Sequence, residues 1–219
     1  ITRQLLMDPQ NRIYSHLHPE GWWMPGGASN TGCEWIVREY PDANLAQLDE
    51  AASILTPTRF IRYPLARIGE RFPFIKPLAS GFLYSPTGML PNTGDLLHYT
   101  AGLEGTAMHE RLAYELLTEI GADVGERIYS TGGGSKSKVW LMMRASMLNR
   151  QLVRLRSSET AMGTALLAAT GAWFGNLLDA SRAMVHPDIV VDPNPAWVQS
   201  YLDMYVQYVD QMRLRGYLD

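Results

Sequence analysis

RIYSTGGGSKSKVWLMMRASML, residues 127–148, is the stretch around which this 219-residue chain is organised. Its first five residues, 127–131, predict a short strand, with apolar Ile128 between polar neighbours. Three glycines follow at 132–134. From Val139 onward apolar residues recur at helical spacing, so we expect a helix to begin near Ser135. The predicted local order is strand, glycine turn, helix.

This order of elements predicts a site for a phosphate or a nucleotide. Glycine adopts backbone angles that are closed to other residues, and it lets a ligand approach the main chain. The N–H groups of a helix's first turn have no partner within the helix, and the helix dipole favours negative charge there. Ser135 or Ser137 could cap the helix or donate a hydrogen bond to the ligand.

Two well-known phosphate motifs fit this turn poorly. A P-loop needs a second glycine at a fixed distance before the lysine, and none precedes Lys138 at that spacing. Gly132 and Gly134 match the first two glycines of a dinucleotide fingerprint, but Ser137 stands where a third glycine or alanine should pack. A tight turn that only connects a strand to a helix stays an alternative, although an exposed triple glycine has an entropic cost.

The composition is that of an ordinary globular protein, with 46% hydrophobic and 19% charged residues, enough for one domain or two small ones. The net charge of −3 argues against nucleic acid or an anionic membrane as the main partner. No apolar run approaches the roughly 20 residues of a membrane helix. Cys33 is the single cysteine, which excludes an internal disulfide and favours the cytoplasm. Because the chain starts at Ile1 in strand-like sequence, we expect it to be part of a longer polypeptide.

Helices and strands are expected along most of the chain. Residues 1–7 and 12–17 predict a hairpin, and the proline- and glycine-rich region 60–91 predicts a long loop. The small residues of a helix at 160–170 predict close packing against a sheet or another helix. The remaining predictions are helices at 42–55, at 95–120 and after Asn194 (with an aromatic stripe facing the core), a strand at 151–155 and a loop at 186–193. Helix and strand alternate after Gly94, which indicates α/β layers.

Three stretches resemble the carboxy-terminal domain of the FGGY carbohydrate kinases. The first is a second glycine turn, GGASN at 26–30, which leads into a tryptophan-containing helix. The second combines Tyr63-Pro64-Leu65 with GERFP at 69–73. The third comprises LEGTA at 103–107, the triple-glycine turn and AMGTA at 161–165, in the order of the family. The resemblance covers residues 22–172. Within the family, the motif residues are most similar to those of the pentulose kinases of xylulose or ribulose type.

The resemblance implies an α/β fold, the actin-like (ribonuclease-H-like) ATPase domain, with residues 1–219 as the carboxy-terminal, nucleotide-side half of a two-domain sugar kinase. It implies ATP and Mg²⁺ as cofactors and a pentulose as the sugar substrate. It is also compatible with a homodimer. The amino-terminal sugar-binding domain and the catalytic aspartate of the family have no counterpart in this sequence. We therefore expect the chain alone to be inactive, since phosphoryl transfer depends on positioning and charge stabilisation.

The resemblance also assigns nucleotide contacts. The triple-glycine turn with Ser137 would lie at the adenine and ribose, and the turn at Gly27 and Ala28 would lie beside the phosphates. The expected nucleotide-binding set is Gly27, Ala28, Ser29, Gly132, Gly133, Gly134, Ser135 and Ser137. No residue of this chain is assigned as catalytic or as a metal ligand.

Three other family positions receive less specific expectations. Glu104 is expected to have a structural role. Glu70 and Arg71 are expected either near the domain cleft or at an interface.

Two alternatives compete with the kinase interpretation. One is a nucleotide-binding or regulatory module of the same fold without kinase activity. The other is a dehydrogenase, which would need an acidic residue about 20 positions after the turn to bind ribose. Glu159 is near that distance, but Arg154 and Arg156 stand close to it and the preceding region does not fit.

Overall fold

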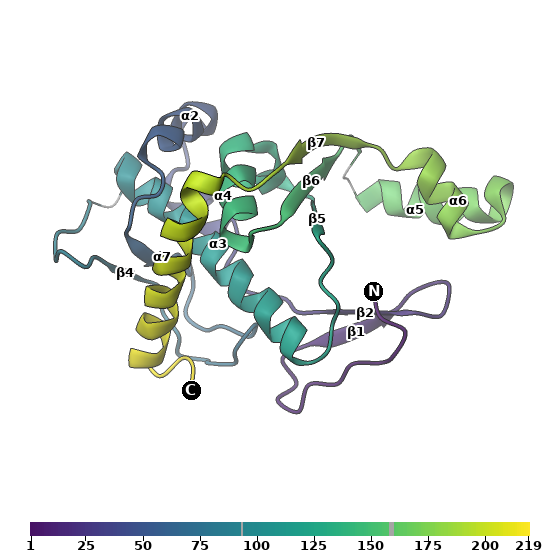
Figure 1. The fold of residues 1–219 in the computed structure, drawn as a ribbon, viewed down its shortest axis with the longest axis horizontal. Helices are drawn as coiled ribbons and strands as arrows, with labels where there is room; N and C mark the ends of the chain where they lie inside the picture. Colours follow the sequence, from purple (N-terminus) through teal and green to yellow (C-terminus); the bar gives the residue numbers. More distant parts are fainter. Residues whose placement is uncertain (93, 158–159) are drawn as a thin grey trace.

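The computed structural model describes residues 1–92, 94–157 and 160–219, and a three-stranded sheet forms part of its centre (Figure 1). β5 (Arg127–Ser130) runs parallel to β6 (Gln151–Leu155), which pairs antiparallel with β7 (Pro187–Val191). α4 (Lys138–Leu148) connects the two parallel strands, as parallel pairing requires. The predicted strands at 127–131 and 151–155 are confirmed, whereas β7 lies where a loop was expected.

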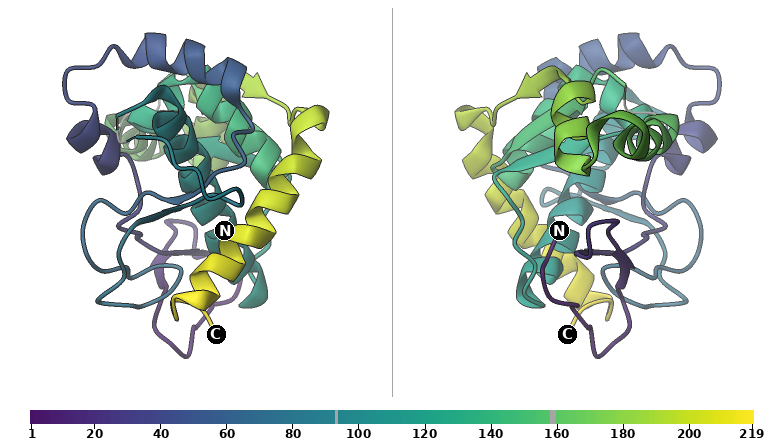
Figure 2. Two further views of the ribbon diagram at one scale, coloured as in Figure 1. Left: turned by 90° about the vertical axis from the view of Figure 1, so that its left-hand side faces the viewer. Right: turned by 90° about the vertical axis from the view of Figure 1, so that its right-hand side faces the viewer.

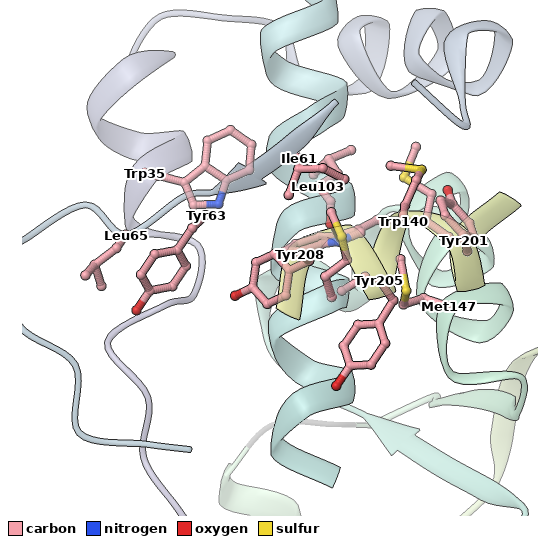
Figure 3. Close-up of a cluster of buried hydrophobic side chains, with 14 of the residues drawn as sticks. Trp35, Ile61, Tyr63, Leu65, Leu103, Trp140, Met147, Tyr201, Tyr205 and Tyr208 are labelled. Atoms are coloured by element: carbon pink, nitrogen blue, oxygen red, sulfur yellow. Dashed lines mark hydrogen bonds between the residues drawn. The ribbon is translucent and has the colours of Figure 1, made fainter. Parts of the chain in front are cut away.

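The main core surrounds a long central helix, α3 (Leu96–Glu119). α4 packs along α3, and α7 (Pro195–Leu214) packs on α4 (Figure 1). Large side chains fill the space between these helices, among them Trp140, Met147, Tyr201 and Tyr208 (Figure 3). The predicted helix at 95–120 and the predicted aromatic stripe after Asn194 are both confirmed.

A glycine pair in α3 lets another element approach this helix closely. A Cβ atom at Gly105 would lie 2.0 Å from the carbonyl oxygen of Arg62 in β3 (Ile61–Tyr63). One at Gly102 would lie 2.4 Å from the ring of Trp35. These contacts explain why glycines stand inside a helix, where they otherwise cost about 1 kcal/mol each relative to alanine.

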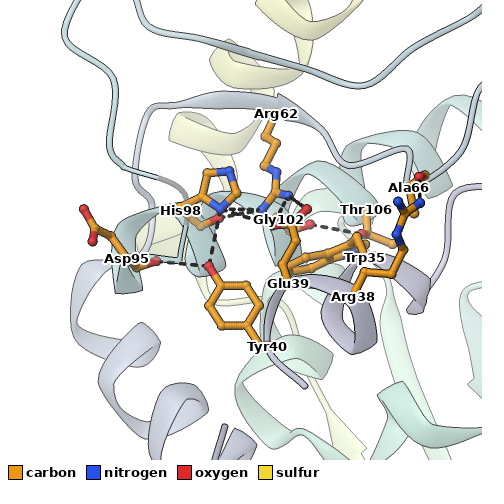
Figure 4. A network of polar contacts seen from close by, with 10 residues as sticks. All are labelled: Trp35, Arg38, Glu39, Tyr40, Arg62, Ala66, Asp95, His98, Gly102 and Thr106. Carbon is orange, nitrogen blue, oxygen red and sulfur yellow. Dashed lines mark hydrogen bonds and ion pairs between the residues drawn. The ribbon is translucent and has the colours of Figure 1, made fainter. Parts of the chain in front are cut away.

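A buried guanidinium joins three elements on this side of α3 (Figure 4). The Nη2 atom of Arg62 donates to both carboxylate oxygens of Glu39 in α1 (Glu34–Glu39), at 2.6 and 2.7 Å. Its Nη1 atom donates to the carbonyl oxygen of His98 at 2.8 Å, and the guanidinium lies 4.6 Å from the centre of the Trp35 ring. Burial lowers the pKa of Arg62, while the Glu39 charge opposes this shift. The ion pair fixes α1 and β3 on α3.

Other sequence expectations were wrong in detail. β1 (Tyr14–Leu17) pairs with β2 (Trp23–Gly26), not with residues 1–7, which contribute a single bridge from Thr2 to Trp23. β3 pairs with β4 (Phe82–Tyr84) inside the region expected to be a loop. α2 (Leu45–Leu55) is capped by Asn44 and begins three residues later than predicted.

The helices α5 (Thr160–Ala169) and α6 (Leu177–Met184), joined by the short π-helix η2 (Thr170–Phe174), extend from one side of the molecule (Figures 1 and 2). The predicted close packing of the small residues is confirmed only at Ala169, which is buried. A Cβ atom at Gly163 would meet nothing within 4 Å, and Ala161, Ala165 and Ala168 are exposed.

Among the described residues, no single helix is long and apolar enough to cross a membrane. Ala161–Phe174 and Leu177–Met184 reach that threshold together by length and composition only, and they are bent by 114°.

Candidate functional site

The two glycine turns of the sequence face one cavity of about 380 Å³. β2 leads into the first turn and β5 leads into the second, while side chains from α3 and α4 complete the wall. The volume lies in the range of roughly 300–1,000 Å³ that is typical of small-molecule sites. Six of the eight predicted residues line this cavity: Gly27, Ser29, Gly132, Gly133, Gly134 and Ser135.

The second turn is fixed by its own hydrogen bonds. Gly132 has a φ of 79°, a conformation that strongly favours glycine. The hydroxyl of Ser135 donates to the Gly132 carbonyl oxygen at 2.7 Å, and the Ser135 amide donates to the same oxygen at 3.2 Å. A 3-10 turn over Gly133–Lys136 follows, so α4 begins at Lys138 rather than near Ser135. The extra turn separates the glycines from the helix start that we expected to face a ligand.

Neither Ala28 nor Ser137 lines the cavity. The Ser137 hydroxyl accepts the amide of Trp140 at 3.1 Å and thereby caps α4. Ser137 instead borders a separate groove between α2 and α4. Gly27 and Ser29 line the cavity and the residue between them does not, an alternation that is typical of extended chain.

Packing requires a glycine at some positions of the two turns but not at others. A Cβ atom at Gly27 would lie 2.1 Å from the Phe72 ring, and one at Gly134 would lie 2.4 Å from the Trp140 ring. Packing therefore excludes a side chain at both positions. A Cβ atom at Gly133 would meet nothing within 4 Å, and its φ is not in the left-handed region. The protein itself does not need a glycine at Gly133, so a side chain there would occupy only the space beside the cavity.

A buried carboxylate, Glu70, organises the first turn. It accepts hydrogen bonds from the Ser29 hydroxyl at 3.0 Å, the Asn30 amide at 2.7 Å and the Thr31 hydroxyl at 2.8 Å. The Tyr63 hydroxyl donates to the same carboxylate at 2.9 Å. Burial alone would raise the pKa of Glu70, but the hydrogen bond and charge of His109 together with the backbone donors lower it to about 2. Glu70 is thus a charged interior support of the turn.

Two neighbouring residues of α3 also reach the cavity. His109 is buried, and its Nε2 atom lies 3.1 Å from the Ser29 hydroxyl oxygen. Glu110 forms a two-point ion pair with Arg144 of α4, at 2.7 and 2.8 Å. Arg144 also donates to the Ser130 hydroxyl at 2.6 Å, immediately before the second turn. None of these supporting residues was predicted from the sequence, because the spacing along α3 does not indicate which of its residues face the turns.

The structure gives the positions of two of the carboxylates outside the turns, Glu104 and Glu70. Glu104 is fully buried and accepts hydrogen bonds from the Thr56 hydroxyl at 2.6 Å and the Thr58 amide at 3.0 Å, which fits the structural role expected for it. Glu70 lies in the interior rather than at an exposed interface. Glu159, which the dehydrogenase alternative needs, lies outside the described residues. Within residues 1–92, 94–157 and 160–219, no group of three or more histidine, cysteine or carboxylate side chains is arranged to hold a metal ion.

The sequence is similar to that of known carbohydrate kinases. Residues 8–172 match the C-terminal domain of the FGGY family of carbohydrate kinases. The xylulose kinase of Bacillus subtilis (strain 168) is 28% identical over 185 residues, which are 83% of this chain and 36% of that protein.

Solved structures of xylulose kinases have a similar fold. A ligand-bound xylulose kinase from Lactobacillus acidophilus superposes with a TM-score of 0.80 at 20% identity, covering 98% of this chain and 44% of the other. A xylulose kinase from Rhodospirillum rubrum gives 0.72 at 27% identity, with 94% and 42% covered.

This chain spans less than half the length of these relatives. The likeness in structure shows the expected α/β fold of the actin-like ATPase type. Because the family match extends over most of the sequence, the chain belongs to the FGGY family of carbohydrate kinases and corresponds to its C-terminal domain.

Proposed function

We propose that the cavity between the two glycine turns binds the adenine nucleotide of a carbohydrate kinase. The observation that carries the proposal is the open space at Gly133, where neither packing nor backbone geometry requires a glycine. A nucleotide bound beside the main chain would explain the glycine, because it leaves no room for a side chain at this position. Membership of a family of ATP-dependent sugar kinases supports the same ligand.

The two turns would hold different parts of the nucleotide. From the resemblance we expect Gly133 and Gly134 to lie at the adenine and ribose, and the turn at Gly27 and Ala28 to lie beside the phosphates. The Ser137 hydroxyl, which caps α4, would contribute by fixing that helix. When bound, ATP supplies the phosphoryl group and Mg²⁺ neutralises its charge. Mg²⁺ often takes most of its ligands from phosphates and water, so the nucleotide itself would carry the metal into the site.

The whole enzyme would transfer the ATP γ-phosphoryl group to a hydroxyl of a pentulose, with xylulose and ribulose as first candidates. Residues 1–219 would form its nucleotide-side domain, and the sugar-binding domain with the catalytic base would lie elsewhere in the enzyme. Xylulose kinases among the relatives support a pentulose. A regulatory module of the same fold without turnover remains the second candidate.

A Gly133→Val substitution tests the nucleotide site. The valine side chain should fill the space beside the cavity and abolish the binding of MgADP, measured by calorimetry. The free energy of unfolding should change by less than about 1 kcal/mol, because a Cβ atom at this position meets no protein atom within 4 Å. Gly125→Val is the matched control, since Gly125 also has open space but does not border the cavity. Unchanged ADP affinity in folded Gly133→Val would refute the site.

A coupled assay of ADP release tests the reaction. The 219-residue chain should show no sugar-dependent turnover, because a general base within reach of the sugar hydroxyl is needed and none is assigned here. The complete kinase should act on xylulose or ribulose, with L-fuculose and gluconate as controls. Turnover by the chain alone would reveal a catalytic residue within it. A complete protein that binds nucleotide but phosphorylates no sugar would favour the regulatory module.

A further inference from the structure

We propose that His109 and Glu110 are positioning residues that together set the distance between the two glycine turns. The proposal rests on the nucleotide site proposed above and adds the residues that hold its two walls. Consecutive residues of an α-helix point about 100° apart. Two consecutive residues of α3 can therefore reach different turns.

His109 holds the first turn. Its Nε2 atom lies 3.1 Å from the Ser29 hydroxyl oxygen, 3.2 Å from the Phe72 carbonyl oxygen and 3.4 Å from the Glu70 carboxylate. The ring is fixed at its other end, where Nδ1 lies 2.9 Å from the Tyr208 hydroxyl of α7. Phe72 is also the residue whose ring packs against Gly27. A single buried imidazole thus contacts both groups that define the first wall.

Glu110 holds the second turn through Arg144. Its two oxygens accept from Nε and Nη2 of Arg144, so the guanidinium is fixed in one orientation. The remaining Nη1 atom donates to the hydroxyl of Ser130, the last residue of β5. Ser130 is buried, and only Thr131 separates it from Gly132. Loss of Glu110 would release the guanidinium and with it the anchor of the second wall.

The two supports act on one cavity from one rigid helix. Of the residues that line the cavity, His109 and Glu110 are neighbours in sequence, yet each holds a different wall. Small displacements of binding groups have large effects on ligand affinity and on reaction geometry. Substitution of either residue should therefore weaken nucleotide binding by more than the loss of its own contacts with the nucleotide would.

Amide hydrogen exchange and ADP calorimetry on the full 219-residue chain test this proposal together. His109→Ala should speed exchange about tenfold at two amides of the first turn, that of Asn30, which donates to Glu70, and that of Thr31, which donates to Ser29. Glu110→Gln should do the same at the Ser135 amide of the second turn. Each variant should bind MgADP about tenfold or more weakly, and His109→Gln, which restores a polar group near Nε2, should recover part of this loss.

Two control variants on α3 separate positioning from general destabilisation. Leu116→Ala removes a buried side chain and Glu115→Gln removes a charge that pairs with Arg111, and neither residue lines the cavity. Both controls should leave ADP affinity and exchange in the turns unchanged. If His109→Ala does not fold, His109→Gln serves as the test, with a smaller effect confined to the first turn.

The outcomes separate the two proposals. Wild-type affinity and unchanged exchange in the variants, with ADP bound by the wild type, would overturn the positioning role. An equal loss of affinity in Leu116→Ala would also overturn it. Changes in exchange at the expected turns, without any ADP binding by the wild type, would refute the nucleotide site and leave the support of the turns standing.

Discussion

Replacing the buried carboxyl group of Glu104 with an amide should remove one specific pH dependence of stability. Glu104 lies in the interior among α3, α7 and the turn at Thr56. Burial raises its pKa from 4.5 to about 7, although hydrogen bonds from Thr56, Thr58 and Tyr201 oppose the shift. The folded protein therefore keeps a proton at Glu104 over a range of pH in which the unfolded chain has lost it.

The direction and size of the effect follow from this difference. A carboxyl group with a raised pKa stabilises the fold fully below the unfolded value of 4.5, and the contribution is lost as the pH rises through about 7. The shift corresponds to about 3 kcal/mol. In Glu104→Gln the amide cannot titrate, so the difference in the free energy of unfolding between wild type and variant should fall by about 3 kcal/mol from pH 4 to pH 8.

Urea denaturation of both proteins at several pH values between 4 and 8 measures this difference. Contributions from other groups, such as the lowered pKa of His98, occur in both proteins and cancel. Glu119→Gln, an exposed change on the same helix, is the control and should follow the wild type. A wild-type-minus-Glu104→Gln difference that stays constant from pH 4 to pH 8 would refute the buried, protonated carboxyl.

Two further substitutions test packing around the site. Gly134→Ala should destabilise the fold by about 1–3 kcal/mol, because its Cβ atom would overlap the Trp140 ring, while Gly133→Ala should be nearly neutral; thermal unfolding compares the pair. Equal stability of the two variants would contradict the different reasons given for these glycines. Tyr205→Ala should lower the melting temperature by roughly 6–20 °C, since a large buried aromatic is removed. Normal stability combined with lost ADP binding would instead place Tyr205 in a ligand site.

The parts of the fold that local pattern controls were predictable from the sequence. The apolar spacing of α3 and the aromatic stripe of α7 located both helices, and Gly121 follows closely after the end of α3. The pairing of β1 was not predictable, because neither residues 1–7 nor Trp23–Gly26 alternates clearly and the choice of partner depends on tertiary contacts. The strands β3 and β4 have three residues each, too few to show a period.

At the candidate site, too, the local elements were predictable from the sequence and the long-range contacts were not. Both glycine turns were found from local sequence, since glycine runs between a strand and a helix have few other uses. The groups that support the turns come from distant positions: Ser29 meets Glu70 and His109, 41 and 80 residues away. No local pattern marks such contacts. Only the structure separated Gly134, which packing explains, from Gly133, which packing does not explain.

Titration of the isotope-labelled chain with MgADP, followed by amide NMR, tests the central claim most directly. The claim predicts saturable shifts that are largest at Gly132–Gly134 and at residues 27–31, the two walls of the cavity. Gly133→Val should remove these shifts. The absence of saturable shifts would contradict the claim. Shifts centred instead on the groove of Ser137, Val139 and Trp197 between α2 and α4 would also contradict it.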